Sequence, residues 1–277
     1  MALGGLQVAL PDDDAALVLQ NPALMPNVSD RSINLGFLSY MQGCKSANAS
    51  YVMAAGERGS WGVGAQLLGY GSMKEMDIEG IELGDFAALD MALSGGYAYT
   101  LTDHWAGGAM GKFVYSKYGH FSSVALAVDL GLNYMNDAGD FSASIVAANL
   151  GGQVKAYDDT FDRIPFDLQL GISKRLGNAP LRFSATLSRL NDWDEAFGRH
   201  LAIGVDVLLS DQIYIAAGYN FRSASQMKIN DGDGSSAHGA GLSLGAGLQL
   251  ERFKLNIGYG KYHVSASSLL FNIAYTL

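Results

Sequence analysis

The chain ends on Leu269-Leu270-Phe271-Asn272-Ile273-Ala274-Tyr275-Thr276-Leu277, and this stretch decides the fold. Every odd position in it carries a large apolar side chain, whereas Asn272, Ala274 and Thr276 between them are small or polar. A period of two residues predicts a β-strand with one apolar and one polar face. In a soluble protein this strand would be an aggregation-prone edge. As the last element of a chain, it is typical of an outer-membrane barrel.

The same alternation recurs upstream in four consecutive segments, at 201–209, 213–221, 240–250 and 253–259. The polar positions of these segments hold mainly Gly, Ala, Ser and Asn, with few of the Lys, Glu and Arg expected beside bulk water. A soluble sandwich also alternates, so a single strand decides nothing. The repeated combination of a bulky apolar face with a small-residue face indicates a barrel whose exterior contacts outer-membrane lipid.

Strand-like segments continue through the whole chain after residue 30. They span roughly 31–40, 46–56, 60–70, 86–100, 103–116, 120–135, 140–150, 165–174, 180–190, 199–209, 211–222, 238–250, 252–262 and 266–277. The connections after even-numbered segments are short, whereas several after odd-numbered segments are long, namely 71–85, 151–164, 191–198 and 223–237. We therefore predict an all-β fold, a transmembrane antiparallel β-barrel of about 14 strands over residues 31–277. The long loops would be extracellular and both termini periplasmic.

Residues 1–30 lack this alternation, and we expect them to form a plug or hatch inside or under the barrel. The acidic residues Asp12, Asp13 and Asp14 precede a short apolar run and predict a solvated cap at the start of a helix. A calcium site there would lack further spaced ligands. The sequence Asn21-Pro22-Ala23-Leu24 predicts the end of that helix or the start of a second turn.

Composition excludes several classes of function. The net charge of −9 argues against a nucleic-acid partner, and the single cysteine, Cys44, excludes an internal disulfide. No HExxH, CxxC or complete glycine-rich nucleotide loop is present, so we expect a non-enzymatic protein without catalytic residues, metal or cofactor. The first residues do not resemble a secretory signal peptide, and we expect such a segment to be encoded upstream.

Two further sets of residues are candidates for function. Six charged residues fall on the inward face of the predicted strands, where they would pair across the lumen or line a conducting path: Lys112, Asp129, Asp167, Arg182, Asp206 and Lys254. Seven large apolar residues fall in the predicted long loops: Met76, Ile78, Ile81, Tyr157, Phe161, Trp193 and Phe197. Apolar side chains on exposed loops indicate a surface that a partner covers.

Four motifs carry a family resemblance: Ala2-Leu3-Gly4-Gly5 followed by Pro11-Asp12-Asp13-Asp14, then Asn21-Pro22-Ala23-Leu24, Val128-Asp129-Leu130-Gly131-Leu132-Asn133-Tyr134, and Asn149-Leu150-Gly151-Gly152. The chain resembles the PorQ family of the type IX secretion system, which is related to the FadL-type barrels. The second and third motifs are shared with the sister family PorV, and the compact length favours PorQ. The resemblance implies an outer-membrane component of the surface attachment complex, holding the surface protein PorZ beside PorU and PorV.

Two other functions compete with this anchoring role. A FadL-like transporter of hydrophobic small molecules would require an apolar cavity near the plug and an opening in the barrel wall. A soluble binding sandwich would purify without detergent. The position of the bulky side chains, against lipid or in a protein core, separates these architectures.

Overall fold

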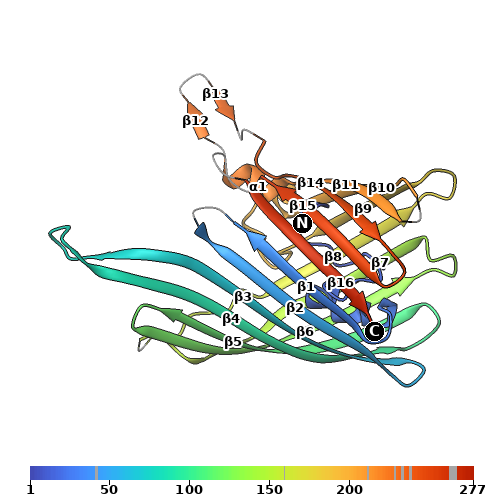
Figure 1. Cartoon of the computed structure of the whole chain (residues 1–277), viewed down its shortest axis with the longest axis horizontal. Coiled ribbons are helices and arrows are strands. Elements are labelled where there is room, and N and C mark those ends of the chain that lie inside the picture. Colours follow the sequence, from blue (N-terminus) through green and yellow to red (C-terminus); the bar gives the residue numbers. More distant parts are fainter. Residues whose placement is uncertain are drawn as a thin grey trace.

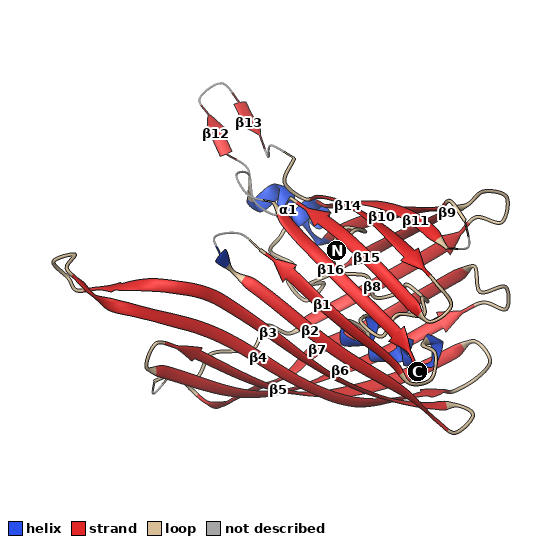
Figure 2. Cartoon of the chain, in the orientation of Figure 1, coloured by secondary structure: helices blue, strands red, loops and turns tan. Residues whose placement is uncertain are grey.

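A computed structural model describes residues 1–40, 43–158, 160–210, 212–227, 229–231, 234–236, 239–261 and 267–277. Fourteen antiparallel strands close into a barrel around an irregular N-terminal segment (Figures 1 and 2). The predicted all-β barrel is therefore confirmed, and so is its number of strands. Parts of the predicted loop 223–237 and residues 262–266, at the ends of two predicted strands, lie outside the described residues.

The strands of the barrel are β1 (Ser32–Ser39), β2 (Lys45–Ala55), β3 (Gly59–Met76), β4 (Glu82–Thr100), β5 (Trp105–Tyr118), β6 (Phe121–Met135), β7 (Phe141–Lys155), β8 (Asp167–Arg175), β9 (Leu181–Leu187), β10 (Leu201–Leu208), β11 (Ile213–Asn220), β14 (Leu242–Gln249), β15 (Phe253–Gly260) and β16 (Ser268–Thr276). Each pairs with its neighbour along the chain, except that β12 (Ile229–Asp231) and β13 (Gly234–Ser236) form a separate two-stranded sheet between β11 and β14. Pairing of β1 with β16 closes the barrel.

The few helical segments lie at the N-terminus and in the connections. They are the 3₁₀ helices η1 (Leu17–Leu19), η2 (Pro22–Asn27) and η4 (Phe197–His200), and the α-helix α1 (Phe221–Gln226). Among the described residues, no helix has both the length and the apolar character needed to cross a membrane.

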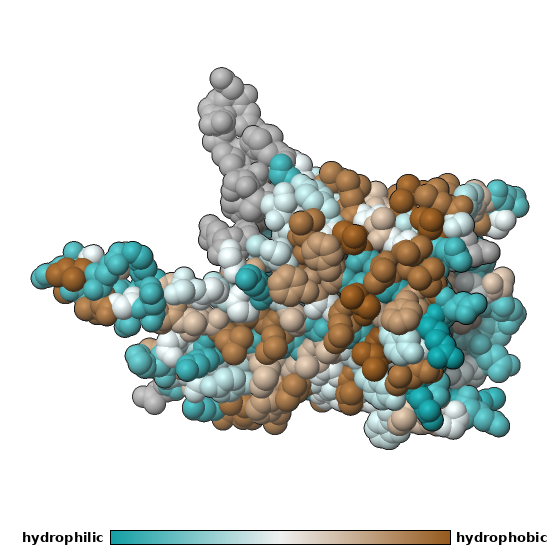
Figure 3. All heavy atoms as spheres, in the orientation of Figure 1, coloured by the Kyte–Doolittle hydropathy of each residue, from teal (hydrophilic) through white to brown (hydrophobic). Residues whose placement is uncertain are grey.

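The terminal strand faces lipid and lumen as its alternation predicts. Phe271 of β16 is 48% exposed on the outside of the barrel, and Ile257 opposite it on β15 is 54% exposed. Their neighbour Asn272 is only 8% exposed and lies inside, where its amide and that of Asn34 on β1 hydrogen-bond each other. Figure 3 shows the hydrophobic side chains gathered over the barrel strands on the viewed face. The bulky residues therefore form a continuous apolar exterior.

The predicted short connections are found at one end of the barrel, whereas the other end has both long and short ones. Connections 56–58, 101–104, 136–140, 176–180 and 250–252 form the short-turn end. The described parts of 156–166, 188–200 and 221–241 lie at the opposite, long-loop end, together with the short connections 77–81 and 119–120. The amide of Leu277 donates to the carbonyl of Arg31 at 3.2 Å, so the barrel begins and ends at the short-turn end.

The predicted loop 71–85 is mostly strand, which corrects the sequence interpretation. The β3–β4 pairing continues through Met73 opposite Phe86 and Lys74 opposite Asp85, and only residues 77–81 remain as a turn. Glycines at 71, 80 and 84, all with positive φ, give this stretch the composition of a loop. The resulting hairpin extends well beyond the other strands, at the left of Figure 1.

Candidate functional site: a plugged lumen and an apolar rim

Residues 1–28 are buried or half-buried against the inner wall of the barrel, whereas Ser29 and Asp30 are exposed. We call residues 1–30 the plug, and their closure of the lumen stays a prediction. Asn21 holds the plug together, because its Oδ1 accepts from the amide of Ala23 at 2.9 Å and its Nδ2 donates to the carbonyl of Val8 at 2.6 Å. The first bond caps η2, with Pro22 at the first helical position, where the missing N–H costs nothing. The predicted turn at Asn21–Leu24 is therefore present, and Leu24 itself is fully buried.

The wall makes room for the plug with glycines on its inward face. A Cβ on Gly108 of β5 would lie 2.5 Å from the carbonyl carbon of Pro22, and one on Gly131 of β6 would overlap the side chain of Asn21. On the far side of the barrel, a Cβ on Gly218 of β11 would overlap the backbone of Leu3 and Gly4. Sequence reasoning missed these contacts; the only available signal was glycine at inward positions of regular strands.

Two of the three plug aspartates form ion pairs with the barrel wall. The guanidinium of Arg182 donates to both carboxylate oxygens of Asp12, at 2.5 and 2.9 Å. Nζ of Lys254 donates to Oδ2 of Asp13 at 2.7 Å. The prediction of a solvated cap is wrong for Asp12 and Asp13, because the wall supplies cations that the local sequence does not reveal.

Asp14 is the aspartate that caps a turn. Its Oδ1 accepts from the amide of Ala16 at 2.8 Å, just before η1, and also from the side chain of Asn34 at 3.0 Å. The cap is half-buried between the plug and the wall rather than fully solvated. Among the described residues, no group of three or more His, Cys, Asp or Glu residues is arranged to hold a metal ion.

The surroundings of Asp13 and Asp14 shift their pKa values in opposite directions. Burial raises the pKa of Asp14, and the bond from the amide of Ala16 only partly offsets it. Burial would also raise the pKa of Asp13, but hydrogen bonds from Lys254 and Ser29 outweigh it and hold the pKa below its ordinary value. The carboxylate of Asp13 therefore stays ionised as one half of an ion pair.

The predicted lumen charges pair locally or with the plug, not across the open lumen. Lys112 forms an ion pair with Asp129 on the neighbouring strand. Asp206, 1% exposed, lies directly opposite Arg182 in the β9–β10 ladder and accepts from its Nε at 3.0 Å. Asp167 forms no ion pair with a described residue and instead accepts from the amide of Arg189 at 2.5 Å and from the side chain of Gln169 at 2.8 Å. Ion pairs between neighbouring strands are favoured because adjacent strands already place the charged side chains within hydrogen-bond distance.

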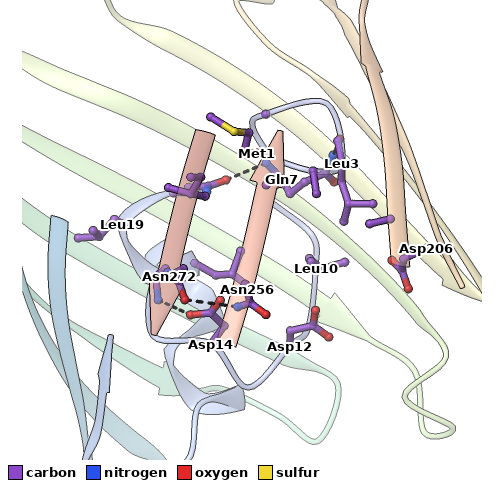
Figure 4. Close-up of a pocket in the computed structure, with 18 of the residues that line it drawn as sticks. Met1, Leu3, Gln7, Leu10, Asp12, Asp14, Leu19, Asp206, Asn256 and Asn272 are labelled. Atoms are coloured by element: carbon purple, nitrogen blue, oxygen red, sulfur yellow. Dashed lines mark hydrogen bonds between the residues drawn. The ribbon is translucent and has the colours of Figure 1, made fainter. Parts of the chain in front are cut away.

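A cavity of about 230 Å³ remains between the plug and the wall. Figure 4 shows the carboxylates of Asp12 and Asp14 at one end of this cavity, with Met1, Leu3 and Gln7 at the other. Its lining thus mixes charged, amide and apolar groups.

A second, polar recess of about 400 Å³ opens beside the turns 176–180 and 209–212 at the short-turn end. Five residues line both spaces: Asp12, Asp14, Arg182, Tyr214 and Asn256. The plug aspartates and their partners therefore lie where the lumen cavity meets the short-turn end.

The seven apolar residues predicted to face a partner are all exposed at the long-loop end. Ile78, at the tip of the β3–β4 hairpin, is 104% exposed, and Trp193, in the connection between β9 and β10, is 82% exposed. The others are Met76, Ile81, Tyr157, Phe161 and Phe197. We call these seven residues the apolar rim. All seven are open to solvent at this end of the barrel, and their contact with a partner stays a prediction.

No family model matches the chain, and no curated protein matches its sequence. Solved structures match its shape. The toluene transporter TodX of Pseudomonas putida is 13% identical, with a TM-score of 0.62 over 99% of this chain and 96% of that one. The CymD monoaromatic hydrocarbon channel is also 13% identical, with a TM-score of 0.62 over 100% and 96%. A FadL homologue of Pseudomonas aeruginosa is 11% identical, with a TM-score of 0.58 over 99% and 95%.

These similarities confirm the fold as that of the FadL-type outer-membrane barrels. At such identities they extend to architecture alone. None of the three is described as part of a type IX secretion complex.

Proposed function

We propose that this chain is an outer-membrane barrel with a closed lumen that anchors a surface protein at its apolar rim. The observation that carries the proposal is the exposure of large apolar side chains, Ile78 and Trp193 above all, at the long-loop end. Exposure of large apolar side chains to water on protruding segments is unfavourable, and binding of a partner would bury them.

Location in the outer membrane is supported by the distribution of side chains. The strands expose apolar residues around the barrel, while the interior holds buried polar groups such as Asn34, Asp129 and Asp206. This is the inverse of a soluble barrel and the expected arrangement in lipid. The FadL-type architecture of the solved neighbours supports the same location.

The finer proposal is membership of the PorQ family, with PorZ as the anchored protein and PorU and PorV in the same complex. Its support is the set of sequence motifs together with their place in the structure. Asn21 and Gly131 come from the two motifs shared with PorV, and they meet where the plug packs on the wall. Their contact supports the wider group of PorQ-like and PorV-like barrels, and the choice of PorQ rests on the other two motifs and the compact length.

A rim variant tests the anchoring function. Replacing Ile78, Ile81, Trp193 and Phe197 by serine should release PorZ from intact cells, measured by surface immunoblotting. The matched control replaces Leu101 and Leu209, which are 52% and 61% exposed at the short-turn end, by serine. We expect the control to retain PorZ. Equal retention by both variants, with both barrels folded by their heat-modifiable migration, would contradict the proposal.

A FadL-like transporter of hydrophobic small molecules is the second candidate. The neighbouring structures favour it, since TodX is described as a toluene transporter and CymD as a monoaromatic hydrocarbon channel. The lumen cavity has an apolar part at Leu3, Leu10 and Leu17. We rank it second because carboxylates line the same cavity and ion pairs tether the plug beneath it. Uptake of toluene into liposomes carrying the chain, above empty liposomes, would reverse this ranking.

A further inference from the structure

The outer end of the β3–β4 hairpin is a two-stranded ribbon with two free edges. We define the ribbon as residues 72–76 and 82–86 with the turn 77–81. Pairing of β2 with β3 stops at Lys45 opposite Gly69, and pairing of β5 with β4 stops at Tyr118 opposite Ala88. Beyond these points the two ribbon strands pair only with each other among the described strands. Their outer edges therefore present unpaired backbone groups that can accept another strand.

The tip of the ribbon is an ordered structure that presents apolar side chains. Oδ1 of Asp77 accepts from the amides of Glu79 and Ile81, each at 2.9 Å, which fixes the turn. Below it, Lys74 forms an ion pair with Glu82 across the two strands. Ile78 and Ile81 are thereby held outward together, as anchors of a binding surface are.

Charge selects among the possible occupants of this surface. Residues 72–86 contain one lysine against five carboxylates, a net charge of −4. An anionic polysaccharide or a second copy of the same ribbon would meet like charge. A protein surface with basic side chains beside an apolar pocket would be complementary.

We propose that the ribbon binds the anchored surface protein by pairing with the edge strand of one of its β-sheets, with Ile78 and Ile81 in an apolar pocket bordered by basic residues. Main-chain pairing would supply affinity, and the tip side chains would supply specificity. This inference rests on the proposed function and adds which element makes the contact and by what chemistry.

The test is photo-crosslinking on intact cells that carry the full chain. A photoreactive benzoylphenylalanine replaces Ile81 on the ribbon in one strain and Phe197, on another connection of the apolar rim, in a second. We expect the strain substituted at Ile81 to give an adduct with one surface protein. The crosslinked peptide should map next to an edge strand and a basic surface of that protein.

A charge-reversal pair tests the complementarity. With the photoreactive residue at position 81, Glu75→Lys with Glu79→Lys should reduce the adduct by about tenfold, since rim charges govern encounter and register. Neither glutamate side chain forms a hydrogen bond or ion pair with a described residue, so the hairpin should stay folded. Glu57→Lys with Asp103→Lys makes the same change in charge on two exposed connections at the short-turn end and should leave the adduct unchanged.

The outcomes separate this inference from the proposed function. An adduct from position 197 but not from 81 would overturn the ribbon contact and leave the anchoring function standing. An adduct between two copies of the chain, with lipopolysaccharide, or with a partner segment remote from any sheet edge would overturn edge pairing. No protein adduct from either position, with the barrel folded and inserted, would overturn both.

Discussion

At the scale of single residues, Arg182 is the cation that links the plug to the wall through two ion pairs. It lies between Asp12 of the plug and Asp206 of the wall and binds both. The side chain of Asp206 is only 1% exposed, so water offers that carboxylate little compensation when the guanidinium is removed, whereas Asp12 is 39% exposed. Removing one partner of a buried ion pair lowers the free energy of unfolding by more than the intact pair contributes, because the remaining charge is left buried and unpaired.

Replacement of Arg182 tests this difference. Arg182→Met should lower the free energy of unfolding by about 3–5 kcal/mol, because Asp206 would stay buried without its cation. The matched control is Lys174→Met, which removes an ion pair with Asp140 from a lysine that is 48% exposed. That change should cost at most about 1 kcal/mol. Urea unfolding in lipid vesicles measures both, and equal losses would show that the lumen site is well hydrated.

Alternation predicted which residues face the lumen but not what they bind. Lys254 and Arg182 fall at inward positions because the strand period is local and regular. Their partners Asp13 and Asp12 lie 241 and 170 residues away in the chain. That pairing depends on the path of an irregular plug, and no local sequence rule encodes such a path.

At the scale of elements, the strands were predictable and the plug packing was not. Strand bounds follow from alternation, which is why the predicted 120–135 and the observed β6 nearly coincide. The outer parts of β3 and β4 were not predicted as strand, because their glycines and charged residues are typical of a loop. Pairing between the two strands makes them a ribbon. The contact of η2 with β5 was invisible in the sequence, because it requires knowing which inward glycine meets which turn.

The η2–β5 contact can be tested by adding one methyl group. Gly108→Ala should push η2 away from the wall, because the new Cβ would meet the backbone of Pro22, which cannot rotate aside as a side chain would. We expect a loss of about 1–3 kcal/mol in the free energy of unfolding. Faster proteinase K digestion of residues 1–30 in detergent should accompany this loss.

Gly152→Ala is the matched control for this substitution. Gly152 also lies in a wall strand, β7, and an added Cβ there would meet nothing within 4 Å. The plug of this variant should be digested at the wild-type rate. If both alanine variants behave alike, the plug is not held by close packing on the wall glycines.

At the scale of the whole molecule, the barrel depends on the plug to fill its interior, and the plug depends on the barrel to bury its apolar side chains. Barrels of about 8 strands are filled by their own side chains, whereas those of about 16 leave an aqueous channel. Small inward residues such as Gly108 and Gly131 leave space inside this barrel, and residues 1–30 occupy it with the fully buried Val8, Val18 and Leu24. The same segment could not bury these side chains alone. Closure of the lumen is thus a property of the assembled chain.

Conductance across planar bilayers measures that closure. The wild-type chain should show no steady current, because we expect the plug and its ion pairs, which lie where the lumen cavity meets the short-turn recess, to block that passage. Removal of residues 1–27 should open a stable water-filled pore. If that truncated chain does not insert, Asp12→Asn with Asp13→Asn in the full chain should still give brief openings, since it weakens the charged tethers and keeps the packed plug. Steady current through the wild type would mean that the two cavities are already connected, and the ranking of anchoring above transport would then fall.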